Sequence, residues 1–147
     1  MAFLKFSVLA FALVAGVSLA AQADEHAGHV WPEGAAPYII SPADGASVKS
    51  PVTVVFGLKG MGVAPAGVEK PKTGHHHLLI DTPAPSGEDL DYAIPADDHH
   101  VHFGGGQTET TVTLAPGKHT LQLMMGDAAH VPHNPPLVSD IVTITVE

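Results

Sequence analysis

The chain has 147 residues, no cysteine, no arginine and a formal net charge of −9. This length predicts a single domain, and the lack of thiols excludes disulfides, thiolate metal ligands and a cysteine nucleophile. The negative charge argues against binding to nucleic acid or anionic lipid and favours cationic partners. Histidine is unusually common, with 11 residues against six lysines and arginines together.

The first residues have the pattern of a secretory signal peptide. Lys5 precedes an apolar run over 6–19, and Ala21-Gln22-Ala23 fits the small-x-small cleavage pattern. We therefore expect residues 1–23 to be removed after Ala23 and the protein to be periplasmic or secreted, with no membrane attachment afterwards. The alternative is an uncleaved anchor, for which the apolar run is short.

Residues 24–37 are polar, contain Gly and Pro, and are expected to form a flexible arm. If cleavage follows Ala23, the mature chain begins Asp24-Glu25-His26. A free amine with histidine in third position forms a square-planar nitrogen set that suits Cu(II) and Ni(II). A cut after Ala20 or Ala21 would remove this motif.

The rest of the chain, 38–147, reads as short strands separated by turns. Alternating or β-branched residues predict strands at 38–40, 48–58, 75–81, 107–114, 118–127 and 140–147. Between them lie a Gly/Pro loop (60–74), a long loop with little regular structure (82–106) and a proline-rich loop (128–139). The pattern predicts an all-β sandwich, immunoglobulin-like or cupredoxin-like, of about six to eight short strands.

Strand alternation limits which histidines can act together. It places His75 and His77 on one face of their strand, with Asp81, and His76 on the opposite, apolar face. His100 and His102 share a face if their segment is extended. Because loops gather at the ends of a sandwich, we expect 75–77, 99–103 and the H-x-x-H pair in the proline-rich loop to meet there.

This histidine pattern predicts a metal site, because neutral imidazole is a ligand for copper, zinc, nickel and iron. Without thiolates, Cu(II) is the expected ion and Zn(II) the alternative. Met124 or Met125 could bind Cu(I), although one of the two must point inward and pack in the core. The predicted ligands are His75, His77, His102, His130 and His133. Secondary candidates, as ligands or as acceptors that orient the ligands, are His76, His100, His119, Asp81 and Asp127.

Several motifs carry a family resemblance: "TGHHHLLID", "HFGGGQTE" and "LAPGKHTLQLMMGDAAHVPHNPPLVS". With them the chain resembles an uncharacterised bacterial family of small exported proteins, a domain of unknown function, some members of which are labelled rod shape-determining proteins. The resemblance implies a compact β domain outside the cytoplasm and no particular biochemical function. The stretch "SPADGASV" and the export signal also resemble periplasmic copper-resistance β-sandwich proteins, although no histidine stands at the first mature position.

The leading interpretation is an exported protein that binds metal for resistance, buffering or delivery. A metal-dependent enzyme is less favoured, because no carboxylate pair, Ser/His/Asp order or H-E-x-x-H motif is present. A third interpretation is a pH-tuned interaction module, in which "HFGGGQ" and "HVPHNPP" contact an envelope protein or a cell-wall ligand.

Overall fold

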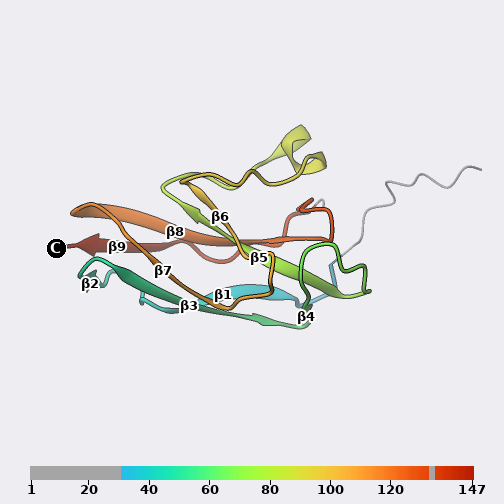
Figure 1. Cartoon of the computed structure of the whole chain (residues 1–147), viewed down its shortest axis with the longest axis horizontal. Coiled ribbons are helices and arrows are strands. Elements are labelled where there is room, and N and C mark those ends of the chain that lie inside the picture. Colours follow the sequence, from blue (N-terminus) through green and yellow to red (C-terminus); the bar gives the residue numbers. More distant parts are fainter. Residues whose placement is uncertain (1–30, 133–134) are drawn as a thin grey trace, which may run out of the picture.

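The computed structural model describes residues 31–132 and 135–147, which form two packed β-sheets (Figure 1). The expected signal peptide and the Asp24-Glu25-His26 motif lie outside these residues. The smaller sheet is antiparallel, in the order β1-β3-β7. Its strands are β1 (Ala36–Ser41), β3 (Val52–Lys59) and β7 (Glu109–Val112).

The larger sheet has the order β2-β9-β8-β5-β4, and β6 pairs with a different stretch of β5 from the one that β4 pairs with. Strands β5 and β8 run antiparallel through its centre. Its strands are β2 (Ser47–Val48), β4 (Gly62–Val63), β5 (Thr73–Ile80), β6 (His100–His102), β8 (Gly117–Gly126) and β9 (Val142–Val146).

The predicted all-β sandwich is confirmed, but two local predictions were wrong. The expected single strand over 48–58 is divided into β2 and β3, because the chain passes from the larger sheet to the smaller one at Ser50-Pro51. Pro51 has no N–H to donate to a continuing ladder. The expected irregular loop 82–106 contains the 3₁₀ helix η1 (Gly87–Asp91) and strand β6. Within the described part of the chain, no helix is long and apolar enough to cross a membrane.

The main core lies between the two sheets. Alternate residues of β3, β5, β8 and β9 point inward, which gives the period of two expected for strands that face a core on one side. Side chains from both layers are almost fully buried there: Val52, Val54 and Phe56 from β3, Leu78 and Ile80 from β5, Leu121 and Leu123 from β8, and Val142, Ile144 and Val146 from β9, with Phe103 beside them.

Strand β5 is buried on both faces, so its histidines are buried whichever face they point to. Its inner face belongs to the main core, whereas its outer face carries Leu79 in a second apolar cluster with Met124, Leu90 and Ile94. Leu90 and Ile94 come from the segment around η1, which lies outside the larger sheet, away from β1 and β3 (Figure 1). Residues on the outer face of β5 are therefore covered instead of facing solvent.

Candidate metal centre

Two histidines of β5 point to its covered outer face. Strand alternation places His75 and His77 on the same side as Leu79, and their side chains are 0% and 1% exposed. His102 of β6 lies directly opposite His77 in the antiparallel register, so it shares this face. The β-ladder therefore fixes three imidazoles side by side.

A fourth histidine approaches from the loop between β8 and β9. His130 has a left-handed backbone with φ of 69°, at the end of a turn that Asp127 organises. Oδ1 of Asp127 accepts the N–H groups of Ala129 (2.8 Å) and Val131 (2.9 Å). The N–H of His130 donates to Asp127 O (3.0 Å), and the N–H of Ile94 donates to His130 O (2.9 Å). These bonds hold His130 over the sheet.

The four rings converge on one point. One ring nitrogen from each of His75, His77, His102 and His130 lies within 4.8 Å of the others. Nε2 of His75 is 3.1 Å from both Nε2 of His77 and Nδ1 of His130. A neutral ring nitrogen carries either one proton or one lone pair, so it makes one good hydrogen bond and not two. A cation between the nitrogens would accept every lone pair at once.

Hydrogen bonding leaves several buried imidazole nitrogens without partners in the described structure. They include Nδ1 of His75, Nδ1 of His77 and Nε2 of His102. Buried polar atoms are normally hydrogen-bonded, and an orphaned group of this kind often marks a functional site. The ring of His102 lies next to the other three, at centroid distances of 5.0 Å (His75), 5.0 Å (His77) and 4.6 Å (His130). The four histidines defined here are called the four-histidine cluster below.

Burial favours the neutral form of three of these rings, His75, His77 and His102. Burial lowers the pKa of His75 to about 4 and that of His77 to about 3, and repulsion from the neighbouring imidazoles adds to the effect. Burial also lowers the pKa of His102. Neutral imidazole is the form that binds metal, so protons compete little for these lone pairs at neutral pH.

Two glycines make room for the cluster, and sequence reasoning missed both. Gly126 lies opposite His75 in the register, and a Cβ there would lie 2.9 Å from Nε2 of His77. A Cβ on Gly104 would lie 2.9 Å from Nε2 of His102 and would overlap its Cε1 atom. The "HFGGGQ" and "MMGD" motifs therefore contain residues whose small size the imidazoles require. Each position carried one hint in the sequence: Gly104 lies two residues after His102, and Gly126 lies near the end of the predicted strand 118–127.

The other histidine of the triplet faces away from this cluster. His76 lies on the inner face of β5, where its ring packs edge-on against Phe56 at a centroid distance of 4.9 Å. It is 0% exposed, and its ring nitrogens make no well-formed hydrogen bond: the one polar contact is a weak one with the backbone of Gly57. Burial lowers its pKa to about 4. His76, a secondary ligand candidate, is therefore not part of the four-histidine cluster, because the sheet separates the two faces.

Two further secondary candidates also lie outside the cluster. His100 pairs through Nδ1 with Oδ1 of Asp97 (2.8 Å), next to the outer apolar cluster. Asp127 holds the turn that positions His130. Its carboxylate also raises the pKa of His75, which opposes the larger, lowering effect of burial. Of the predicted primary ligands, His133 lies outside the described residues.

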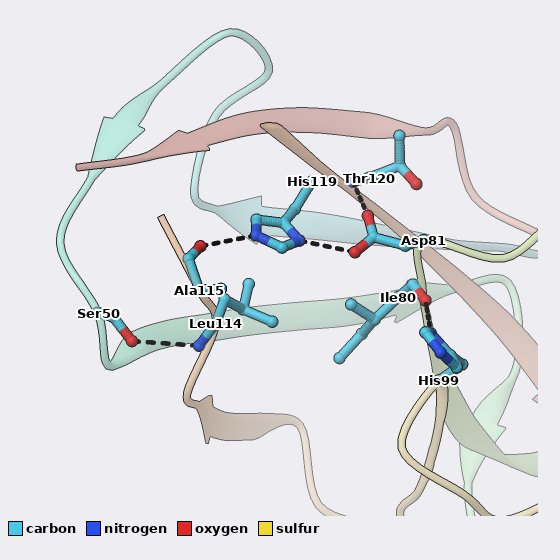
Figure 2. Close-up of polar contacts among 8 residues, drawn as sticks. All are labelled: Ser50, Ile80, Asp81, His99, Leu114, Ala115, His119 and Thr120. Atoms are coloured by element: carbon cyan, nitrogen blue, oxygen red, sulfur yellow. Dashed lines mark hydrogen bonds and ion pairs between the residues drawn. The ribbon is translucent and has the colours of Figure 1, made fainter. Parts of the chain in front are cut away.

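His119 and Asp81 form a separate pair just beyond the other end of β5 (Figure 2). Nδ1 of His119 donates to Oδ2 of Asp81 (2.6 Å), and Nε2 donates to Ala115 O (2.8 Å). Oδ1 of Asp81 accepts the N–H of Thr120 (2.8 Å). Because both ring nitrogens face oxygen acceptors, the imidazolium form satisfies both bonds, and the hydrogen bond to Asp81 raises the pKa of His119.

The two methionines of β8 are both buried. Met125 lies opposite His76 on the inner face, whereas Met124 lies opposite His77 and packs with Leu79 and Leu90 on the outer face. The expectation that one of them packs in the core is confirmed by Met125. Met124 is also enclosed by apolar neighbours. Its packing against leucines accounts for Met124 without a role as a ligand.

The chain belongs to the family described as Domain of unknown function (DUF4399), whose model matches residues 54–147. All four histidines of the cluster and both glycines that accommodate them lie in the matched segment. No curated protein and no solved structure matches the chain.

Proposed function

We propose that this protein binds a single ion of copper or zinc through the imidazoles of His75, His77, His102 and His130. The observation that carries the proposal is the convergence of one nitrogen from each ring within 4.8 Å. Zinc–imidazole bonds are about 2.0–2.1 Å long, which sets the ligand nitrogens roughly 3.3–3.4 Å apart around one tetrahedral ion. The pairs His75–His77 and His75–His130, with nitrogens 3.1 Å apart, are already close to this spacing.

Four protein ligands suit a protein that holds its metal more than one that uses it in catalysis. Catalytic zinc sites commonly keep one position open for water or substrate, whereas closed sites have four protein ligands. Two of the four ligands here are also fully buried. We therefore propose a role in metal resistance, buffering or delivery and not a metal-dependent enzyme.

We also propose that the protein works in the periplasm or after secretion. The support is the signal-like sequence over 1–23 and the choice of ligand. In an oxidising compartment, thiolate ligands are lost when they form disulfides, whereas imidazole ligands are not affected in this way. A cysteine-free chain with 11 histidines fits such a compartment.

Equilibrium dialysis at neutral pH tests the proposal, with the full chain after Ala23 purified without a tag or a metal-affinity step. We expect one Zn(II) or Cu(II) per cluster, and His77→Ala should weaken binding by about 100-fold or more, since even changes beside a ligand commonly cost 10–100-fold. Copper is measured in a His26→Ala background, which removes the amino-terminal motif as a competing site.

The matched control is His99→Ala. His99 is exposed, lies outside the cluster and bonds through Nδ1 to Ile80 O (2.8 Å), so the change removes a histidine without removing a predicted ligand. Binding should be unchanged in this variant. The proposal fails if the wild-type chain binds neither ion tightly, or if His77→Ala binds as tightly as the wild type.

A further inference from the structure

The arrangement of the four rings around their common point limits which ion they can bind well. Four ligands around one ion form either a flattened square or a tetrahedron. In a square, two of the six separations are diagonals that are about 1.4 times the sides, whereas in a tetrahedron all six are equal. An imidazole that binds an ion points one nitrogen at it, so the ring centroids lie in the same directions as the ligand nitrogens. The six distances between ring centroids therefore distinguish the two geometries.

The distances favour the tetrahedron. Around the ring of neighbours, the centroid separations are 4.9 Å (His75–His77), 5.0 Å (His77–His102), 4.6 Å (His102–His130) and 5.0 Å (His75–His130). The two remaining pairs would be the diagonals of a square. They measure 6.0 Å (His77–His130) and 5.0 Å (His75–His102), so one of them is no longer than a side.

The fold itself produces this geometry. His75, His77 and His102 stand on one face of a continuous β-ladder, which gives a triangular base. His130 comes from a loop over that face and closes the site from above, held by the bonds to Asp127 and Ile94. A flat arrangement would require His130 to move down into the layer of the other rings, and this would break the hydrogen bonds that hold its backbone over the sheet.

Different ions respond differently to such a ligand set. Zn(II) has a filled d shell and no geometric preference of its own, and it is usually tetrahedral in proteins. Cu(I) has the same filled shell. Cu(II) and Ni(II) prefer square-planar or tetragonal ligand sets. A ligand set held near a tetrahedron therefore penalises Cu(II) and Ni(II) relative to Zn(II) and Cu(I).

We propose that the four-histidine cluster selects a d¹⁰ ion, Zn(II) or Cu(I), and binds ions that prefer a planar geometry less well than their usual order of affinity predicts. This inference rests on the proposed function, because it concerns the same site. The histidine content alone suggests Cu(II), whereas the ring geometry favours Zn(II) or Cu(I). Any copper in the cluster would be held more tightly as Cu(I) than as Cu(II).

Cobalt and nickel provide the test, since nitrogen ligands ordinarily bind Ni(II) more tightly than Co(II). Both affinities are measured by chelator competition on the full chain after Ala23 in the His26→Ala background. We expect the order to be reversed, with Co(II) bound about tenfold more tightly than Ni(II), and the Co(II) complex to show the intense visible bands of a tetrahedral ion. Tighter binding of Ni(II), or the weak bands of six-coordinate Co(II), would overturn the inference.

A variant that removes the fourth ligand shows whether this geometry depends on His130. Glycine tolerates the φ of 69° at this position, so His130→Gly preserves the turn while it removes the ring. We expect the intense Co(II) bands and the preference for Co(II) over Ni(II) to disappear. If both persist, His130 does not shape the site and the inference is wrong.

Two further results complete the test. Separate competition experiments with Zn(II) in air and with Cu(I) under a reductant distinguish the two d¹⁰ ions, and tight binding of either one supports the inference. If the chain binds none of the four ions, the proposed function itself fails. If it binds all of them but prefers Ni(II) to Co(II), the proposed function stands and only the selection of a d¹⁰ ion fails.

Discussion

At the scale of single residues, small side chains are as important to the cluster as the imidazoles. Gly104 and Gly126 each lie where a methyl group would meet a ring nitrogen of His102 or His77. Neither glycine has the positive φ that would explain its presence by backbone conformation alone. Their role is steric, and it can be separated from ligation because a glycine offers no ligand atom.

The pair Gly104→Ala and Gly105→Ala tests this role. At Gly104 the new methyl group overlaps the His102 ring, whereas at Gly105 it meets only the flexible side chain of Gln107 at 3.0 Å. We expect Gly104→Ala to weaken Zn(II) binding by about tenfold, because a displaced ligand loses its bond geometry. Gly105→Ala should bind normally. Isothermal titration measures both, and equal affinities for the two variants would contradict a steric role for Gly104.

His76 gives the opposite case, a histidine that the cluster does not use. Its two ring nitrogens are buried with only a weak contact to the Gly57 backbone, and such poorly satisfied atoms cost free energy that an apolar side chain of similar size avoids. His76→Leu should therefore raise the free energy of unfolding by about 1 kcal/mol in urea titrations at neutral pH. It should leave Zn(II) binding unchanged, in contrast to His77→Leu. A loss of Zn(II) affinity as large as that of His77→Leu would show that the two faces of β5 are not independent.

At the scale of elements, β5 was largely predictable from sequence. The stretch "HHHLLID" already indicated a strand, and a period of two required His75 and His77 to share a face opposite His76. The partners of β5 were not predictable in the same way. The short strand β6 has only three residues, too few for a pattern, and its register with His77 depends on long-range pairing.

The position of His130 could be suspected from the sequence, but its exact placement could not be deduced. The sequence showed the H-x-x-H loop, yet its placement over the sheet depends on a turn held by Asp127 and on a hydrogen bond from Ile94, which is 36 residues away in the chain. Loop contacts of this kind follow from tertiary packing and leave no periodic signal. The split of 48–58 into two strands had a signal in Pro51, which the alternation of the flanking residues outweighed.

The His119–Asp81 pair makes the end of β5 sensitive to pH. The folded pKa of His119 is raised, so its stabilisation is complete below the unfolded value of 6.5 and is lost as pH rises through the folded value. The folded pKa of Asp81 is lowered, so its contribution is complete above 3.8 and is lost as pH falls through its folded value. The pair therefore stabilises the fold most between these limits.

His119→Gln tests this pair, because glutamine keeps a donor for Asp81 and does not titrate. We expect the variant to be less stable than the wild type by on the order of 1 kcal/mol near pH 6, since the Asp81 side chain is 35% exposed and solvent screens the interaction. The difference should shrink by about pH 9. Urea unfolding at the two pH values measures it, and a difference that grows with pH would contradict the assignment.

At the scale of the whole molecule, a bound ion would link three separate segments on the outer face of the larger sheet. The cluster joins β5, β6 and the loop after β8, and the loop contacts the segment around η1 through His130 and Ile94. The protein has no disulfide to restrain these segments. A metal that binds only the folded chain would therefore add directly to the stability of the domain.

Thermal unfolding measures this linkage. At a free Zn(II) concentration about 100 times the dissociation constant, the free energy of unfolding should rise by about 2.7 kcal/mol, and the Tm should rise with it. His77→Ala should show little increase at the same concentration, whereas His99→Ala should respond like the wild type. An equal increase in Tm for all three chains would mean that Zn(II) stabilises the protein from another site.

The sandwich architecture and the histidines of the cluster could thus be predicted from the sequence, whereas the arrangement of the four rings required the structure. X-ray absorption at the zinc edge tests that geometry most directly, on the His26→Ala chain loaded with one equivalent of Zn(II). Four imidazole nitrogens at about 2.0 Å, falling to three in His130→Gly, are the predicted result. A shell dominated by oxygen, or a spectrum that does not change in His130→Gly, would contradict a centre built from His75, His77, His102 and His130.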